Sequence, residues 1–249
     1  MKRKHALVLA FIITGLIASN SYLFSSVRKE SSREEVKISR VIDGDTIQLE
    51  DGRTIRFLNI NSPEKKTSLH NESLKYLKQF ENSSVQVQIT SSDRYERALA
   101  RVYSLENKYL NLEMVEQGLA SKFLVDNSEL KQFKEAEMLA IKEGRGIWQK
   151  SEYSNCFSAE INEREESVIL KNSCSGISLK DWLIKDESRK TYTFPEISFN
   201  EITLHSEAGE DTPSNIYWNS KQNIWNNDRD SLYLFDAQGR LAHYATYGY

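Results

Sequence analysis

The sequence contains few residues of several types, and these shortages exclude some classes of protein. It has only 3 prolines, 10 glycines and no long biased tract among 249 residues, which argues against collagen-like and disordered chains. Four histidines, at positions 5, 70, 205 and 243, show no metal-ligand spacing with either of the 2 cysteines, which disfavours a zinc site. A chain of this length holds one or two domains with a real core.

A strong excess of basic charge is also absent. The net charge is +3 over residues 1–35, +1 over residues 36–150 and −7 over residues 151–249. Proteins that bind nucleic acid without specificity usually carry a strongly basic domain, because neutralising phosphates supplies most of their affinity. Bulk charge therefore gives no support to that function here.

The first 24 residues have the pattern of an export signal. Lys2, Arg3 and Lys4 precede an apolar run over residues 6–18, and a shorter apolar group ends at Phe24. The shorter run suits a signal peptide, while the whole stretch is just long enough to span ~30 Å of hydrocarbon. We therefore predict a signal peptide or an N-terminal membrane anchor over residues 1–24, a polar linker over residues 25–35, and a chain that lies on the extracellular side.

The two cysteines, Cys156 and Cys174, both lie in the second half of the chain. An exported chain meets an oxidising environment, so we expect a disulfide between them. The alternative is a pair of unpaired, buried thiols.

Residues 36–150 have the pattern of a small barrel with helices. Short strand patterns occur around residues 36–38, 46–49, 54–58, 85–89 and 98–105, with a hairpin turn at Asp51-Gly52. Helical periodicity covers residues 69–80, 110–117 and 129–141, and Gly118 and Gly144 end the last two segments. Five short strands with about three helices fit a Greek-key barrel of the OB type.

After Lys150 the pattern changes to short apolar runs separated by Asn, Ser, Gly and Asp. This pattern predicts a β-sandwich without helices. We place the boundary between the two domains near residues 151–155, where the sequence leaves little room for a flexible linker.

Three segments carry charged residues that chemistry could use. Asp43 and Asp45 lie two residues apart before a strand, where both carboxylates could share one cation, although a solvated turn is the commoner interpretation. Arg56 lies inside an apolar strand, where an unpaired charge is costly, so a structural Arg–Asp pair is the plain alternative. Arg97 precedes another strand, in what is otherwise a charged turn.

Together these segments resemble the staphylococcal nuclease family over roughly residues 36–150. The resemblance rests on Val41–Thr46, Ile55–Leu58 with Ser62–Glu64, Asp93–Ala100 and Glu143–Trp148, in that order and spacing. It implies an OB-fold and calcium-dependent hydrolysis of DNA and RNA to 3′-phosphate products. No small organic cofactor is implied.

The resemblance also implies a role for each matching residue. Asp45 would be a calcium ligand, Asn61 would stand at a second ligand position, Ser62 would offer its backbone carbonyl, and Asp43 would lie in the outer shell. Arg56 and Arg97 would hold the scissile phosphate, and Glu64 would be the general base that activates water. Hard oxygen ligands, two planar guanidinium groups and a nearby carboxylate suit phosphodiester hydrolysis.

The sequence departs from the family pattern at two positions. Asn61 stands where the family has an aspartate, which keeps a ligand oxygen but removes a negative charge and should weaken calcium binding. Glu96 stands where a glycine is usual. The alternative to a working nuclease is therefore a noncatalytic cell-surface protein that binds nucleic acid or another ligand through a degenerate site.

Residues 157–249 resemble the lamin-tail domain, on segments that include 167–172, 177–186, 191–195, 216–218, 224–228 and 230–236. The resemblance implies an immunoglobulin-like β-sandwich that meets a cell-envelope partner. Trp182, Trp218 and Trp225 are interpreted as core packing instead of a platform for bases, because the net charge of −7 repels phosphate. The predicted partners of the whole chain are DNA, RNA, the membrane if residues 1–24 are retained, and the envelope.

Overall fold

The structure is a computed structural model that describes residues 32–65 and 68–249. Its chain divides into two compact units. Among the described residues, the first unit comprises those up to Ile42 together with Thr46–Leu58 and Lys78–Asn111. The second unit comprises Asp43–Asp45, the described residues between Asn59 and Leu77, and Leu112–Tyr249. The predicted signal peptide or anchor over residues 1–24 lies outside the described residues.

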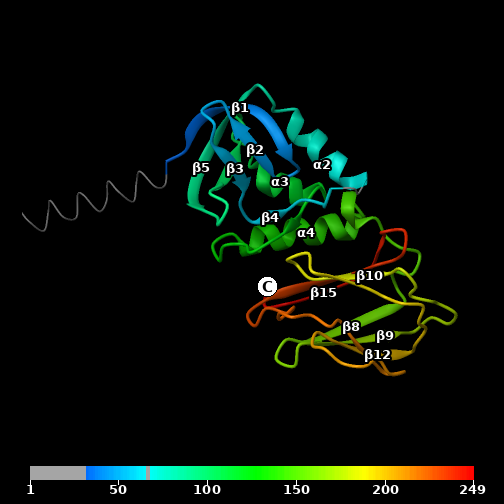
Figure 1. Cartoon of the computed structure of the whole chain (residues 1–249). Helices are drawn as coiled ribbons and strands as arrows, with labels where there is room; N and C mark the ends of the chain where they lie inside the picture. Colours follow the sequence, from blue (N-terminus) through cyan, green and yellow to red (C-terminus); the bar gives the residue numbers. More distant parts are fainter. Residues whose placement is uncertain (1–31, 66–67) are drawn as a thin grey trace, which may run out of the picture. The chain divides into compact units, whose positions relative to one another are not determined.

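The first unit is built around a closed five-stranded barrel in the order β1-β2-β3-β6-β5 (Figure 1). The strands are β1 (Glu34–Asp43), β2 (Thr46–Leu49), β3 (Thr54–Phe57), β5 (Ser84–Ser92) and β6 (Ala98–Tyr103). Strands β3 and β6 pair in parallel, whereas β1 with β5, β2 with β3, and β5 with β6 pair antiparallel. Alternation explains the strands, since Val85 and Val87 are fully buried while Gln86 and Gln88 between and beside them are half-buried. The predicted OB-type barrel is confirmed.

A buried asparagine that the sequence pattern did not single out holds two strands of this unit together. Asn111 accepts a hydrogen bond from the Val102 amide at 2.9 Å. Its Nδ2 donates to the carbonyls of Leu58 at 2.8 Å and Ala100 at 3.0 Å. These bonds tie the end of β3 to β6 where the regular ladder stops.

The described residues contain the three predicted α-helices: α2 (Ser68–Lys78), α3 (Leu110–Glu116) and α4 (Leu130–Glu143). Gly144 ends α4 in the left-handed region at φ 68°, and its amide donates to the carbonyls of Ala140 and Ile141. Gly118 follows α3 at φ 67°, and a Cβ there would come within 2.3 Å of the Arg145 carbonyl oxygen. Both glycines therefore end helices because their positive φ values disfavour residues that have a Cβ atom.

Two very short strands, β4 (Ile60–Asn61) and β7 (Ser121–Lys122), pair with each other in the second unit.

Residues 157–249, called the lamin-tail region after the resemblance described above, contain two four-stranded sheets. Their strand orders are β11-β10-β14-β15 and β13-β12-β9-β8. Their strands are β8 (Phe157–Asn162), β9 (Ser167–Asn172), β10 (Leu183–Lys185), β11 (Thr191–Thr193), β12 (Glu201–His205), β13 (Asn215–Tyr217), β14 (Asp230–Phe235) and β15 (Leu241–Tyr247). The predicted immunoglobulin-like sandwich is confirmed, and no helix occurs among residues 151–249.

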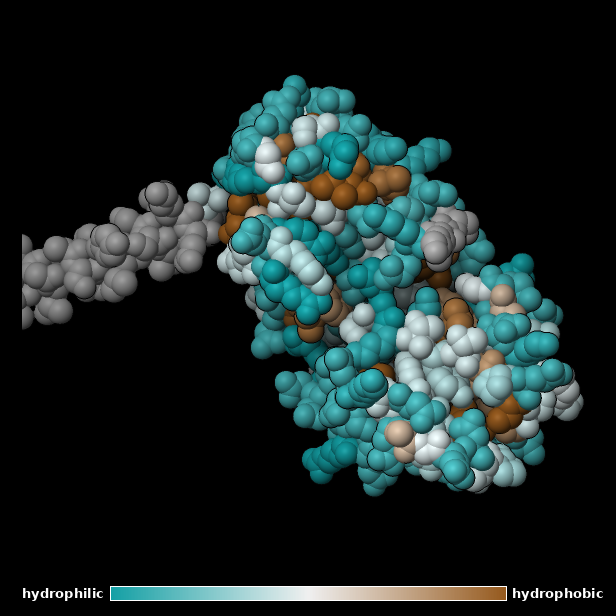
Figure 2. All heavy atoms as spheres, in the orientation of Figure 1, coloured by the Kyte–Doolittle hydropathy of each residue, from teal (hydrophilic) through white to brown (hydrophobic). Residues whose placement is uncertain are grey.

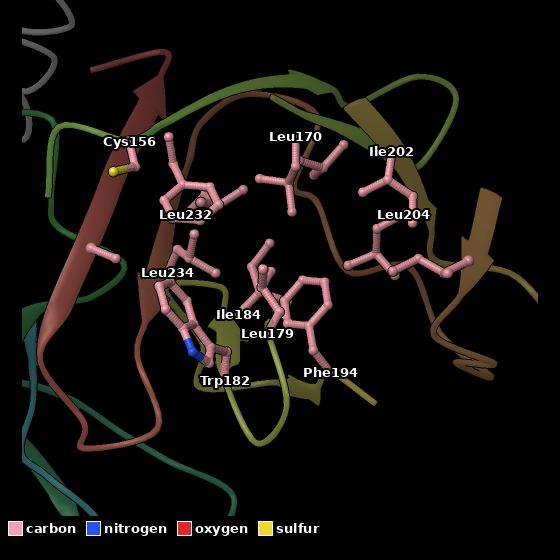
Figure 3. Packing of buried hydrophobic residues seen from close by; sticks show 14 of the residues in the cluster. Cys156, Leu170, Leu179, Trp182, Ile184, Phe194, Ile202, Leu204, Leu232 and Leu234 are labelled. Carbon is pink, nitrogen blue, oxygen red and sulfur yellow. The ribbon is translucent and has the colours of Figure 1, made fainter. Parts of the chain in front are cut away.

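The core between these sheets contains most of the large apolar side chains of the region. Figure 3 shows Trp182, Phe194 and Leu234 pointing into the same core, with Cys156 at its edge. Trp182 and Trp225 are 4% and 1% exposed, which confirms that they pack in the core. The predicted disulfide between Cys156 and Cys174 is present.

Helix α4 and the 3-10 turn η1 (Gly146–Trp148) pack against the sheet that contains β14 and β15, all within the second unit (Figure 1). Trp148 stacks on Tyr233 with 5.0 Å between ring centroids. The Ser151 amide donates to the Leu241 carbonyl at 2.9 Å. The segment that joins the nuclease-like and lamin-tail sequences, around residues 148–151, is therefore held by packing and hydrogen bonds.

The face drawn in Figure 2 is mainly hydrophilic, with apolar residues in small separate groups. Across residues 32–65 and 68–249, no helix is both long and apolar enough to cross a bilayer.

Candidate active site

The turn between β1 and β2 places Asp45 against the segment that follows β4. Asp45 is only 5% exposed, and its Oδ2 accepts hydrogen bonds from the Ser62 amide at 2.9 Å and the Ser62 hydroxyl at 2.8 Å. Gly44 permits this approach, because a Cβ there would lie 2.8 Å from the Cβ atoms of both Ser62 and Ser73. Two of the predicted calcium ligands are therefore brought together.

Asp43 lies at the end of β1 and has different partners from Asp45. Its Oδ1 lies 3.3 Å from His70 Nδ1, and its Oδ2 lies 3.8 Å from Lys65 Nζ. Its Oδ1 also accepts a hydrogen bond from the Gly44 amide at 2.8 Å. The outer-shell role of Asp43 stays a prediction.

The segment after β4 carries the next three predicted site residues. Asn61 is 3% exposed, and its Nδ2 donates to the Glu187 carbonyl at 3.3 Å. The Ser62 carbonyl accepts a hydrogen bond from Arg189 Nη1 at 3.1 Å. Glu64, with 61% of its side chain exposed, pairs with the same Nη1 at 3.0 Å from its Oε1. One arginine of the lamin-tail region therefore contacts both the predicted ligand carbonyl and the predicted base.

The two predicted phosphate-binding arginines belong to the first unit. Arg56 lies on β3, opposite Thr46 of β2, and is 8% exposed with its Nη1 donating to the Phe57 carbonyl. Arg97 precedes β6, and its Nε and Nη2 both lie 2.7 Å from Asp93 Oδ2. Burial opposes ionisation of Asp93, but its hydrogen bonds to Arg97 lower the pKa of this carboxyl. The Arg97 guanidinium is thus oriented by a charged partner.

Glu96 has a backbone conformation that accounts for the glycine usual in the family. Its φ is 62°, in the left-handed region that residues with a Cβ rarely adopt. The turn closes through Asp93, whose carbonyl accepts the Glu96 amide at 3.1 Å and whose Oδ1 accepts the Tyr95 amide at 2.8 Å. A glutamate can therefore replace the glycine at the cost of some backbone strain.

The donor set around Asp45 suits a hard cation. A buried carboxylate, an amide oxygen and a backbone carbonyl are the ligand types that calcium prefers. In the part of the chain that the structure describes, no group of three or more His, Cys, Asp or Glu residues could hold a metal. A calcium site here would thus combine the Asp45 carboxylate with neutral oxygens from Asn61 and Ser62, and the weak calcium affinity stays a prediction.

A second group of charged residues was missed by the sequence analysis. Lys122 and Glu137 are fully buried, and the Lys122 ammonium lies 3.2 Å from an oxygen of Glu137 and 3.2 Å from an oxygen of Glu187. Burial opposes the charge of Lys122, but Glu137 and Glu187 raise its pKa, so it stays protonated. Burial in turn raises the pKa of Glu137. The one feature of the sequence that could have indicated a buried charge was the position of Lys122 in a short stretch between Ala120 and Phe123.

Comparisons with known proteins agree with this architecture. Residues 54–150 match the family model described as Staphylococcal nuclease homologue, and residues 149–249 match the Lamin Tail Domain. The first matched range contains Arg56, Asn61, Ser62, Glu64 and Arg97, whereas Asp43 and Asp45 lie before it.

Relatives named as endonucleases were also found. The chain is 30% identical to Endonuclease YhcR of Bacillus subtilis (strain 168) over 181 residues, which is 64% of this chain and 14% of that protein. It is 38% identical over 88 residues to uncharacterized endonucleases of Escherichia coli O157:H7 and of Escherichia coli, which is 34% of this chain and 58% of each relative. The chain therefore spans only part of the length of these relatives.

Proposed function

We propose that this chain is an exported calcium-dependent nuclease. The proposal is supported by the match of residues 54–150 to the staphylococcal nuclease homologue model and of residues 149–249 to the lamin tail domain. The reaction would be hydrolysis of phosphodiester bonds of DNA and RNA to 3′-phosphate ends. The observation that carries the proposal is that the sequence has Arg56, Glu64 and Arg97 at the positions of the family motif. Within the second unit, the hydrogen bonds from Ser62 to Asp45 support it.

In this reaction each residue has a separate task. Glu64 takes the proton of the attacking water while the new bond from oxygen to phosphorus forms. The bond from phosphorus to the 5′ oxygen of the next nucleotide breaks, and this oxygen takes a proton from solvent water and leaves as a 5′ hydroxyl. Arg56 and Arg97 bind the phosphate oxygens on which charge increases, a task for which the planar guanidinium is better suited than an ammonium. Asp45, Asn61 and the Ser62 carbonyl would hold calcium, which supplies positive charge beside the phosphate when bound.

Export is the second part of the proposal. The basic residues before the apolar run over residues 6–18 support it, and so does the Cys156–Cys174 disulfide, which is typical of oxidising compartments. The nuclease would act on the extracellular side, either anchored by residues 1–24 or released after their cleavage. The lamin-tail region would contact a partner in the cell envelope.

A noncatalytic binding protein is the second candidate, and Asn61 is the observation that favours it. Its amide provides no negative charge for calcium, and its Nδ2 is already bonded to the Glu187 carbonyl. In that case the barrel would bind nucleic acid or another ligand without cleaving it.

Cleavage assays with a calcium titration test the proposal. The full chain is incubated with single-stranded DNA and with RNA, from chelator to ~10 mM calcium, a range that reaches weak extracellular sites. We expect calcium-dependent cleavage, and Glu64→Gln should lower its rate by roughly 10²- to 10⁴-fold because the general base is lost. Arg56→Lys should also lose activity while remaining folded.

Glu72→Gln, on an exposed position of α2, is the matched control for Glu64→Gln and should cleave like the wild type. A folded wild-type chain that cleaves neither substrate at any calcium concentration would favour the binding protein. Equal rates in wild type, Glu64→Gln and Arg56→Lys would contradict the assigned site.

A further inference from the structure

Arg189 lies in a tight turn of the lamin-tail region, between β10 and β11, and reaches the predicted site. Its Nη1 lies 3.0 Å from Glu64 Oε1 and 3.1 Å from the Ser62 carbonyl oxygen. The side chain of Glu64 is 61% exposed, so the contact with Arg189 restricts a carboxylate that lies largely in water. A guanidinium held by the neighbouring Ser62 carbonyl fixes the direction from which Glu64 is contacted.

Hydrogen bonds to Asp186 hold the turn that presents Arg189. Asp186 Oδ1 accepts the Lys190 amide at 2.6 Å, and the Arg189 amide donates to the Asp186 carbonyl at 3.2 Å. Arg189 itself has a φ of 74°, in the left-handed region. A residue with a Cβ persists in this conformation only where the surrounding structure imposes it, and such positions are frequent at functional sites.

Contacts of the buried Glu187 side chain and backbone also hold this turn in place. Glu187, two residues before Arg189, is 4% exposed and binds both Lys122 Nζ at 3.2 Å and the Leu124 amide at 3.1 Å. Its own amide donates to Asp230 Oδ1 at 3.1 Å. The turn that contains Arg189 is therefore held through Glu187, two residues earlier, by a buried cluster of charged side chains.

A cavity of about 400 Å³ in the second unit opens beside this contact. Glu64 and Arg189 both line it, as do Lys185, Trp148 and Phe235. The Lys185 ammonium lies 5.6 Å from the Phe235 ring centroid, and burial lowers its pKa while Glu64 opposes that change. The base thus faces open space on one side and a fixed arginine on the other.

We propose that Arg189 is a positioning residue that holds the general base Glu64 in its catalytic orientation, so that the lamin-tail region completes the nuclease site. This inference rests on the proposed function for the role of Glu64. It assigns to the lamin-tail region a part in catalysis in addition to any envelope contact.

The test measures kcat and KM separately, at saturating calcium, for the full chain and for Arg189→Gln. We expect kcat to fall by roughly ten- to a hundredfold with little change in KM, because a base that is free to move spends less time in reach of the water. Arg189→Lys should recover part of the loss, since it restores the charge without the planar group. Arg164→Gln, at an exposed position in the turn between β8 and β9, is the matched control and should resemble the wild type.

Other results would overturn the proposal in recognisable ways. A rise in KM with unchanged kcat would assign Arg189 to phosphate binding. Unchanged kcat with less calcium required for half-maximal rate would make Arg189 an inhibitory contact that competes with the metal. A lower thermal midpoint with unchanged kinetics would make the contact merely structural.

A metal-free measurement separates this inference from the proposed function. In chelator, the unfolding free energies of Arg189→Gln, Glu64→Gln and the double variant should be non-additive if the two side chains interact as described. Additive changes would contradict the contact whether or not the chain is a nuclease. Absence of cleavage by the wild type would instead contradict the proposed function, and normal kcat in Arg189→Gln beside an active wild type would contradict only the inference.

Discussion

The nuclease-matched and lamin-tail regions of the second unit meet at two groups of charged side chains that differ in burial. In the first, Lys122 and Glu137 are 0% exposed and Glu187 is 4% exposed. In the second, the side chains of Glu64 and Arg189 are 61% and 38% exposed. Both groups join a cation to a carboxylate across the same two regions, yet their contributions to the molecule should be very different.

Burial decides the difference. Breaking a buried pair leaves an uncompensated charge in a medium that cannot solvate it. Water partly replaces the contacts of a broken exposed pair, so the coupling energy of an exposed pair is small but measurable. The cluster around Lys122 should therefore contribute to stability, and the Glu64–Arg189 pair should chiefly set orientation. Because Glu187 and Arg189 share one turn, the stable group also fixes the position of the exposed one.

The largest expected effect comes from removing the buried cation. Lys122→Met keeps an apolar stem but leaves Glu137 and Glu187 without their ammonium, so we expect the free energy of unfolding to fall by about 3–5 kcal/mol. Urea denaturation at neutral pH measures the change. The matched control is Lys131→Met on the exposed face of α4, which should change stability by less than about 0.5 kcal/mol. Similar losses of unfolding free energy in both variants would show that burial does not make Lys122 more important for stability than an exposed lysine.

The same variant makes a pH-dependent prediction. Burial already raises the pKa of Glu137 above its ordinary value of 4.5, and Lys122 opposes that rise. Without Lys122 the pKa of folded Glu137 rises further, so the folded variant binds more protons than the unfolded chain above pH 4.5. Its stability then falls as pH rises from about 4.5 through the folded pKa. The deficit of Lys122→Met relative to wild type should be smaller at pH 5 than at pH 8, and an equal deficit at both would argue that Glu137 is already neutral.

Removing the disulfide, which belongs to neither group, should cause a loss of stability of intermediate size. The Cys156–Cys174 bond spans 18 residues, and replacing both cysteines by alanine should cost about 3 kcal/mol in the chain-entropy model. Thermal unfolding with and without reductant measures it, and the double variant should not respond to reductant. If its kcat in the nuclease assay also fell, the position of Arg189 would depend on the whole sandwich and not only on the buried cluster.

The sequence predicted those elements whose signals are local. Alternation at Val85 and Val87 identified a strand, and Gly118 and Gly144 marked the ends of two helices. The chain has only two cysteines, and the predicted export led to the prediction that they form a disulfide. Family motifs supplied Arg56, Glu64 and Arg97.

The features that escaped prediction are those without a local signal. Strands β4 and β7 have two residues each, too few for any periodicity. Arg189 lies far from Glu64 in the sequence, in a polar stretch that resembles any solvated turn. The acidic charge of the lamin-tail region also suggested repulsion from a phosphate site. Net charge does not show where single cations point, and both Arg189 and Arg229 contact the nuclease-matched region.

Asn61 connects the two groups and makes the smallest and most specific prediction. Its Nδ2 donates to the carbonyl of Glu187, and an aspartate there would place an acceptor against an acceptor. Without calcium, Asn61→Asp should therefore lower the free energy of unfolding by about 1–3 kcal/mol. With calcium the added charge should lower the concentration needed for half-maximal cleavage, because a carboxylate binds this ion more strongly than an amide.

Asn172→Asp is the matched control, since Asn172 is also buried and its Nδ2 donates to the Phe199 carbonyl at 3.2 Å. It should lose comparable stability, measured by denaturation in chelator, while its calcium titration stays like that of the wild type. If Asn61→Asp behaved like this control in both measurements, Asn61 would not be a calcium ligand, and its amide would serve only to join the strand end to the turn that carries Arg189.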